Sequence, residues 1–233
     1  MSASVNRVVV MPAFHAAKTL APTLARLPPG LFDRVLVCDD ASDDETVAVA
    51  RTLDVELIIH PTNRGYGGAQ KSLYTRALEL GAQQVAMLHP DNQYDAERLT
   101  EVMAALDACD FVLGSRIADG RAGERGMPWW KRGSNRALTF VQNQVFGTRF
   151  TDLHTGLRAW NRSTLERIAW QTMADDFGFD AEFLVALHAA GLRGREVAVG
   201  SWYLPESSSV GLRQSVKYGA QVLASLRKYR RPS

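Results

Sequence analysis

Short apolar runs alternate with longer amphipathic stretches through the first half of the chain. The runs typical of strands span residues 5–11, 34–38, 55–59, 84–88 and 111–113, and the helical patterns between them span 18–27, 45–53, 66–80 and 97–108. Apolar strands separated by helices of about 10–15 residues are typical of βαβ units. The sequence therefore predicts an α/β fold with a mainly parallel central sheet flanked by helices on both faces.

The second half of the chain is less regular. It predicts a loop at 118–127, helices at 129–146, 181–190 and 212–230, and strands at 156–160 and 197–204. No repeat or linker interrupts it, so the 233 residues are expected to form one domain. The net charge of +2 gives no reason to expect a nucleic-acid partner.

Cysteine usage and the apolar runs of the sequence predict the cellular compartment and the kind of membrane contact. Cys38 and Cys109 have no metal-ligand spacing and are expected to be buried thiols of a cytoplasmic protein. No signal peptide is visible. No window approaches the roughly 18 apolar residues that span a bilayer, so any membrane contact is expected to be peripheral.

Acidic groups follow two of the predicted strands. Asp39 and Asp40 end the second strand, and the segment from His89 to Gln93 ends the fourth. Ligands of open α/β sheets bind beyond the carboxyl ends of the strands. Two acidic strand ends in one crevice suit a ligand with a base, a ribose, phosphates and a divalent cation, such as a nucleotide-sugar. Helix capping is the alternative role for the aspartates.

Two further strand ends could offer backbone N–H groups to that ligand. The first strand ends at Pro12 and Ala13 just before a helix, and the segment Asn63, Arg64 and Gly65 joins the third strand to another helix. Backbone N–H groups at a helix start bind anions, glycine lets backbone approach a ligand closely, and Arg64 could face a phosphate. Ordinary turns remain the alternative for both segments.

The segment after the fourth strand has the spacing of a metal site. Asp91 and Gln93 alternate in an extended segment and so aim two oxygens toward one point. Oxygen ligands suit Mg²⁺ or Mn²⁺, and a diphosphate would complete the coordination shell.

Seven motifs occur in order along the chain. They are VVVMPAF (8–14), VCDDASDDET (37–46), NRGYGGA (63–69), LHPDNQYD (88–95), GSR (114–116), HTGLRAW (154–160) and GFDAEF (178–183). Together they resemble the family-2 glycosyltransferases of GT-A fold, most closely the dolichol-phosphate mannose synthase and polyprenyl-phosphate glycosyltransferase branch. The resemblance covers about residues 5–210 and implies a single Rossmann-like domain. Its nucleotide-sugar and metal half would be about 1–115, its acceptor half about 116–210, and a basic amphipathic helix would follow at 211–233.

The resemblance also implies roles for particular residues. Asp39 and Asp40 would hold the nucleoside, and Arg116 would lie near the phosphates. The family's metal motif maps to His89, Asp91 and Gln93, with Mg²⁺ or Mn²⁺ as the cofactor. This chain departs from the family where His89 replaces an aspartate, which puts metal dependence in question. Ala16 and Ala17 also replace common acidic or amide residues.

The predicted acceptor side begins at two adjacent tryptophans. Lys131, Arg132 and Ser134 follow them, and aromatic and basic side chains together suit a lipid phosphate at a membrane interface. The resemblance implies that these three residues hold that phosphate. The alternative is a helix start with buried tryptophans and solvated cations. The final helix carries an apolar stripe with flanking cations, which could lie in a membrane interface or pack on the domain.

The expected reaction is inverting transfer of a sugar from a UDP- or GDP-sugar to a polyprenyl or dolichyl phosphate. A phosphate monoester is largely dianionic at neutral pH and needs no general base. The alternative is a hydroxyl acceptor with Asp180 as the base, and a non-catalytic nucleotide-sugar-binding protein is less favoured. The protein would act at the inner face of the membrane. Longer family members carry transmembrane helices, so a separate membrane subunit is a candidate partner.

Overall fold

The computed structural model describes residues 5–203 and 212–229 and confirms the predicted α/β fold. The strands are β1 (Arg7–Ala13), β2 (Arg34–Asp39), β3 (Glu56–Ile59), β4 (Gln84–Leu88), β5 (Phe111–Ser115), β6 (Leu157–Asn161) and β7 (Gly194–Ala198). Within the described residues they form one sheet in the order β3-β2-β1-β4-β6-β5-β7. The sheet is mainly parallel because β6 alone runs antiparallel to its neighbours.

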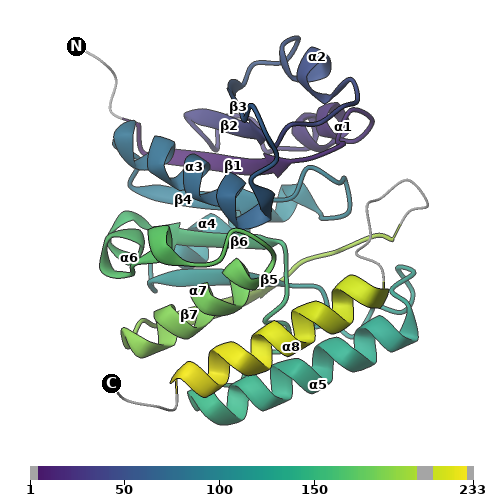
Figure 1. The fold of residues 1–233 in the computed structure, drawn as a ribbon, viewed down its shortest axis with the longest axis vertical. Coiled ribbons are helices and arrows are strands. Elements are labelled where there is room, and N and C mark those ends of the chain that lie inside the picture. Colours follow the sequence, from purple (N-terminus) through teal and green to yellow (C-terminus); the bar gives the residue numbers. More distant parts are fainter. Residues whose placement is uncertain (1–4, 204–211, 230–233) are drawn as a thin grey trace.

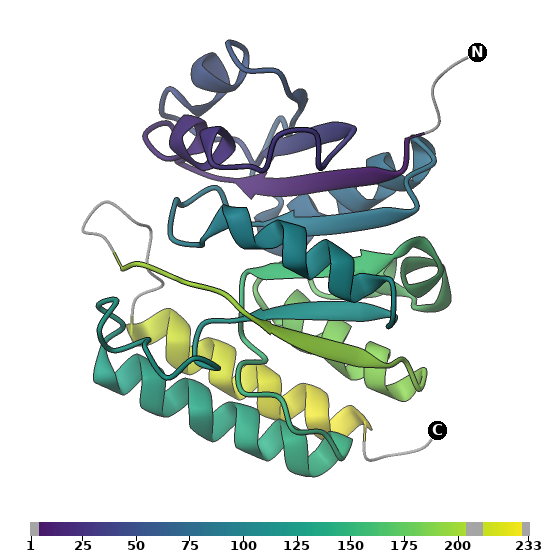
Figure 2. The same cartoon turned by 180° about the vertical axis from the view of Figure 1, so that it is seen from behind.

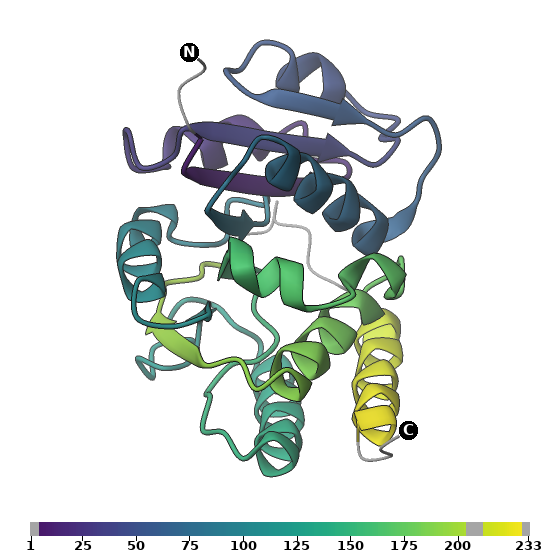
Figure 3. The same cartoon turned by 90° about the vertical axis from the view of Figure 1, so that its left-hand side faces the viewer.

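Helices cover both faces of the sheet. They are α1 (Leu20–Ala25), α2 (Thr46–Ala50), α3 (Gly65–Glu79), α4 (Leu99–Leu106), α5 (Trp129–Phe146), α6 (Arg162–Arg167), α7 (Gly178–Ala189) and α8 (Leu212–Tyr229), with 3₁₀ turns at Ala96–Arg98 and Trp170–Thr172. Helices α3 and α7 lie on one face (Figure 1), and α1 and α4 lie on the other (Figure 2). The long helices α5 and α8 lie side by side at the end of the molecule near β7 (Figure 3).

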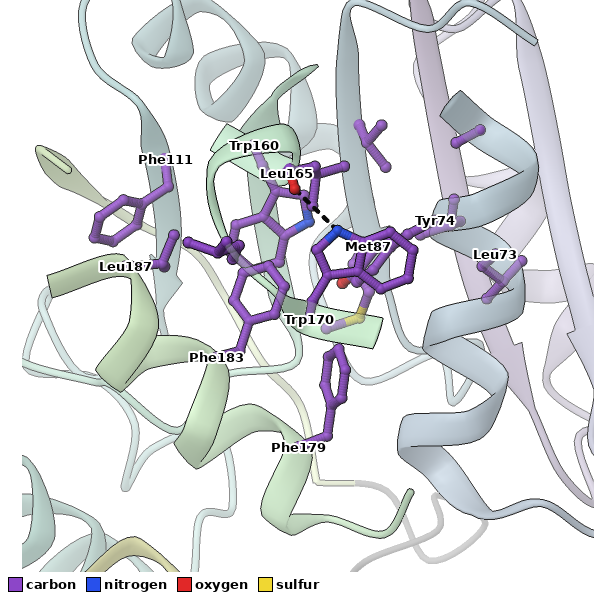
Figure 4. Packing of buried hydrophobic residues seen from close by; sticks show 14 of the residues in the cluster. Leu73, Tyr74, Met87, Phe111, Trp160, Leu165, Trp170, Phe179, Phe183 and Leu187 are labelled. Carbon is purple, nitrogen blue, oxygen red and sulfur yellow. Dashed lines mark hydrogen bonds between the residues drawn. The ribbon is translucent and has the colours of Figure 1, made fainter. Parts of the chain in front are cut away.

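The core is divided between these two faces by the strand alternation. In β1, Val8 and Val10 join the cluster under α3 and α7, whereas Val9 and Met11 join the cluster under α4. Aromatic rings fill the first cluster, where the Tyr74 ring packs edge-on against the rings of Trp160 and Trp170 (Figure 4). This period-two burial on both faces explains why β1, β2 and β4 consist mainly of apolar residues.

The second half of the chain differs from prediction in two places. The strand expected at 197–204 begins instead at Gly194 and ends at Ala198, because its pairing with β5 covers only those residues. Leu204 lies outside the described residues. Helix α6 was not predicted, since its six residues carry little apolar pattern. Helix α5 has the predicted bounds, and α8 begins at the predicted residue.

Candidate active site

The carboxyl ends of β1, β2 and β4 meet at one edge of the sheet and end in unusual backbone. His15, Ala41 and Asn92 follow these strands with φ values of 53°, 60° and 55°. Residues other than glycine rarely adopt positive φ, and such strained positions gather at functional sites. The three sharp turns therefore mark this edge as the place to look for a ligand.

A cavity of about 860 Å³, here called the donor cavity, opens at this edge. Its lining includes the predicted residues Pro12, Ala13, Asp40, Asn63, Gly65, His89 and Asp91. Phe14 also lines it, with 49% of its surface exposed, and its ring stacks on that of His15. Phe14 was predicted only as part of a motif, and the signal that could have singled it out is an aromatic residue directly after a strand.

Asp40 organises the donor cavity wall through its carboxylate. Its oxygens accept hydrogen bonds from the backbone N–H groups of Arg64 and Gly65, each at 2.8 Å, and one lies 2.7 Å from Nδ1 of His60. Asp40 therefore shapes the loop that precedes α3, and these bonds occupy much of its capacity to accept from a nucleoside.

Three predicted donor contacts have other positions or partners. Asp39 does not line the donor cavity, and its Oδ2 accepts a hydrogen bond from Ser42 N at 3.1 Å within the loop that precedes α2, so it does not cap that helix. The Arg64 side chain is exposed and also absent from the lining. The Gly65 N–H is bonded to Asp40, so it is not free for a phosphate.

A second cavity of about 470 Å³, the acceptor cavity, lies on the side of α5 and α8. It shares Tyr66, His89, Asp91 and Phe177 with the donor cavity, so the two cavities meet at these four residues. Phe177 was not among the predicted site residues, and its ring stacks on that of Tyr66 with 5.0 Å between the ring centroids. A molecule bound in one cavity could thus react at this junction with a molecule bound in the other.

Arg116 places a fixed positive charge in the acceptor cavity. Its guanidinium binds Asp152 through both carboxylate oxygens, at 2.7 and 3.0 Å, and also donates to the His154 carbonyl oxygen. Burial works to raise the pKa of Asp152, but the adjacent Arg116 outweighs it and holds that pKa at about 2. Arg116 lines the acceptor cavity and not the donor cavity.

The three residues predicted to bind the acceptor phosphate do not all face the same cavity. Lys131 and Ser134 line the acceptor cavity, whereas Arg132 does not and lies beside Gly123. Burial, with repulsion from Arg116, lowers the pKa of Lys131. Within the described residues Lys131 forms no ion pair, and its ammonium lies 5.4 Å from the Tyr203 ring centroid. It is therefore a cation available to an anionic ligand.

Asp91 is the acidic residue that lies at the junction of the cavities, and it forms no ion pair with any described residue, although Arg116 and Lys131 are near enough to attract it. Burial raises its pKa to about 6. The described ranges contain no group of three or more His, Cys, Asp or Glu side chains able to hold a metal by themselves. Nucleotide sites commonly hold Mg²⁺ with one or two carboxylates plus substrate phosphates, and Asp91 fits that arrangement. Gln93 lines only the acceptor cavity.

One ring nitrogen of His89 already has a protein partner. Its Nε2 lies 2.9 Å from the Tyr66 hydroxyl, so a metal-ligand role could fall only to Nδ1. Burial lowers the pKa of His89 to about 4, which makes the ring neutral at physiological pH.

Both carboxylate oxygens of Asp180 accept hydrogen bonds from other side chains of the protein. Oδ2 accepts from Arg158 at 2.9 Å and from Tyr66 at 3.2 Å, and Oδ1 accepts from Gln70 at 3.0 Å. Arg158 is buried, and its charge needs this partner. The geometry therefore favours a positioning role for Asp180 over the general-base role of the alternative hypothesis.

Acid should destabilise the protein partly through His154. Burial lowers the pKa of this histidine to about 3, while its value in the unfolded chain is near 6.5. Below pH 6.5 the unfolded chain binds the extra proton, so stability present above that pH is lost as the pH falls. Urea unfolding between pH 6 and pH 4.5 gives the slope of the free energy of unfolding against pH. We expect His154→Gln to reduce that slope by up to about 1.4 kcal/mol per pH unit. An unchanged slope would contradict this assignment.

Comparison with known proteins identifies the class. Residues 8–169 match the model of Glycosyl transferase family 2, and the chain belongs to that family. The protein is thus a glycosyltransferase.

Individual relatives and solved structures agree with that class. A UDP-N-acetylglucosamine–dolichyl-phosphate N-acetylglucosaminyltransferase of Methanococcus voltae is 26% identical, covering 87% of this chain and 88% of its own. An undecaprenyl-phosphate mannosyltransferase of Micrococcus luteus is 26% identical, covering 82% of each chain. Glucosyl-3-phosphoglycerate synthase of Mycobacterium tuberculosis, crystallised with UDP, matches with a TM-score of 0.72 at 16% identity over 97% of this chain and 80% of its own, which shows the shared GT-A fold.

Proposed function

We propose that this protein is an inverting glycosyltransferase that moves a sugar from a UDP- or GDP-sugar to a polyprenyl or dolichyl phosphate. The observation that carries the proposal is the pair of cavities that meet at Tyr66, His89, Asp91 and Phe177. The donor cavity is formed at strand ends, as nucleotide sites in open α/β sheets are. The acceptor cavity holds the cations Arg116 and Lys131, which suit a phosphate.

The surroundings of the acceptor cavity suit a lipid. Apolar side chains from α5 and α8 line it, among them Trp130, Leu138 and Val216. Val216 also has 67% of its surface exposed, so the cavity reaches the protein surface between the two helices. A polyprenyl chain leaving the phosphate site could pass over this apolar rim.

The outer faces of α5 and α8 suit a membrane surface. Trp129 and Phe140 are 79% and 63% exposed and lie eleven residues apart, on one face of α5 with the exposed Arg136 between them. Leu223 and the exposed Arg227 extend a similar face from Val216 on α8. Exposed aromatic side chains suit the level of the lipid headgroups, and basic side chains beside them attract anionic headgroups. No helix within the described residues could cross a membrane. The exposed apolar and basic side chains of α5 and α8 support peripheral contact with the inner membrane face.

The reaction needs no base in this scheme. The acceptor phosphate is largely dianionic at neutral pH, and Lys131 and Arg116 orient it toward the junction. One displacement from the opposite face of the sugar inverts the anomeric centre. Asp91 would hold a divalent cation with the donor diphosphate, and that cation would supply positive charge to the leaving group. The names of the Methanococcus and Micrococcus relatives, which specify lipid phosphates, support this acceptor.

Adjacent cations on α5 provide the test of the acceptor. Lys131→Ala should raise the KM for a polyprenyl phosphate about 10- to 100-fold, because a hydrogen bond to a charged group contributes about 1.5–3 kcal/mol. The matched control is Arg132→Ala, which removes a neighbouring cation outside the cavity. Donor affinity, measured by calorimetry, should be unchanged in both variants. Equal KM effects in the two variants, or none in Lys131→Ala, would contradict the phosphate site.

A further inference from the structure

A chain of hydrogen bonds joins four side chains beside the cavity junction. Arg158 Nη2 donates to Asp180 Oδ2 at 2.9 Å, and the Tyr66 hydroxyl lies 3.2 Å from that same oxygen. The Tyr66 hydroxyl also lies 2.9 Å from Nε2 of His89. The series of hydrogen bonds therefore connects a buried arginine to a histidine that lines both cavities.

The donors and acceptors in this series of hydrogen bonds determine which nitrogen of His89 carries the hydrogen. Asp180 pairs with Arg158 and also accepts a hydrogen bond from Gln70, so its carboxylate oxygens act as acceptors. The single proton of Tyr66 therefore goes to Asp180, and the tyrosine oxygen must accept from its other neighbour. His89 Nε2 is thus the donor. The reverse assignment would set two oxygen lone pairs against each other at 3.2 Å.

This arrangement leaves Nδ1 of His89 with a bare lone pair. Nδ1 forms no hydrogen bond with any described residue, and the ring packs so closely on Gly156 that a Cβ there would lie 2.8 Å from Nδ1. Glycine at 156 thus gives the imidazole room beside Asp91, which lines the same two cavities. Histidines that bind metals usually donate their other N–H to a carboxylate or a similar acceptor, which here is reached through Tyr66.

We propose that Tyr66 is a positioning residue that holds His89 with Nδ1 as a ligand for the divalent cation beside Asp91. The inference rests on the proposed function in taking that cation to be the one bound with the donor diphosphate. An imidazole ligand favours transition-metal ions, whereas Mg²⁺ prefers oxygen ligands. The site should therefore prefer transition-metal ions to Mg²⁺, because His89 would supply a nitrogen ligand.

The first test reads the position of the proton without any metal. Long-range ¹H–¹⁵N spectra of the full chain, labelled at histidine, should show His89 as the Nε2–H form. Tyr66→Phe should lose that preference. Tyr74→Phe should keep it, because the Tyr74 hydroxyl donates to Gln70 on the same helix and does not touch His89. An Nδ1–H form in the parent, or an unchanged spectrum in Tyr66→Phe, would overturn the proposal.

The second test reads the metal directly. Pulsed electron paramagnetic resonance of Mn²⁺ bound with UDP or GDP should show coupling to a histidine nitrogen in the parent. His89→Asp should bind Mn²⁺ without that coupling, and Tyr66→Phe should bind Mn²⁺ about 10-fold more weakly. Absence of bound Mn²⁺, or bound Mn²⁺ without nitrogen coupling in the parent, would overturn the assignment. No acceptor is present, so this outcome is independent of the Lys131 test.

Discussion

Replacing Asp91 by asparagine is expected to lower kcat/KM for sugar transfer about a thousandfold. Asp91 lies where the cavities meet and forms no ion pair with any described residue. Loss of the carboxylate should remove the charge that holds a divalent cation at the diphosphate, which contributes several kcal/mol, and about 4 kcal/mol corresponds to that factor. Steady-state rates with saturating Mn²⁺ measure the effect.

The same variant should keep its fold. Burial raises the pKa of Asp91 to about 6, so its charge is unfavourable in the unliganded protein and asparagine should not reduce stability at pH 7. Asp95→Asn is the matched control, since Asp95 belongs to the same segment but pairs with Arg26 and lines neither cavity. Activity of Asp91→Asn within tenfold of the parent would remove Asp91 from the site.

Asp180→Asn should lower the free energy of unfolding by about 3 kcal/mol. The change leaves Arg158 buried, with 1% of its side chain exposed, and without its counter-charge. Breaking a buried ion pair by removing one partner typically costs about 3–5 kcal/mol. Urea unfolding at pH 7 measures the loss, and the paired change Arg158→Met with Asp180→Leu should recover much of it.

This variant also separates the two acceptor hypotheses. In the phosphate scheme no base is needed, so any loss of rate in Asp180→Asn should follow the loss of folded protein and of the Tyr66 contact. A variant that is folded and binds Mn²⁺ with UDP or GDP as tightly as the parent, but has no activity, would indicate instead that Asp180 removes a proton. That outcome would favour a hydroxyl acceptor.

The fold was largely predictable because its signals are local. Strand and helix periods placed β1 to β5 and the full length of α5 close to their observed positions. The direction of β6 was not predictable, since an apolar run of five residues has no direction until it pairs with β4 and β5. The shift of β7 has the same cause, because its bounds are set by pairing with β5.

The candidate site was predictable only where motifs end strands. Asp91 and Asp40 follow apolar runs and line the donor cavity as expected. Lys131 and Arg132 could not be separated, because neighbouring residues on a helix point about 100° apart and the sequence does not say which faces the cavity. Partners distant in sequence, such as Asp152 with Arg116, were missed since only folding brings them together.

The measurement that tests the account most directly is the structure of the product. The purified protein is incubated with UDP- and GDP-sugars in turn, Mn²⁺, and either a short polyprenyl phosphate or the matching polyprenol. Phosphorus and proton magnetic resonance then identify the linkage and the anomeric configuration. The account predicts a sugar phosphodiester of inverted configuration from the phosphate and no product from the alcohol. Transfer to the alcohol, retained configuration, or no transfer to the phosphate from any donor would contradict it.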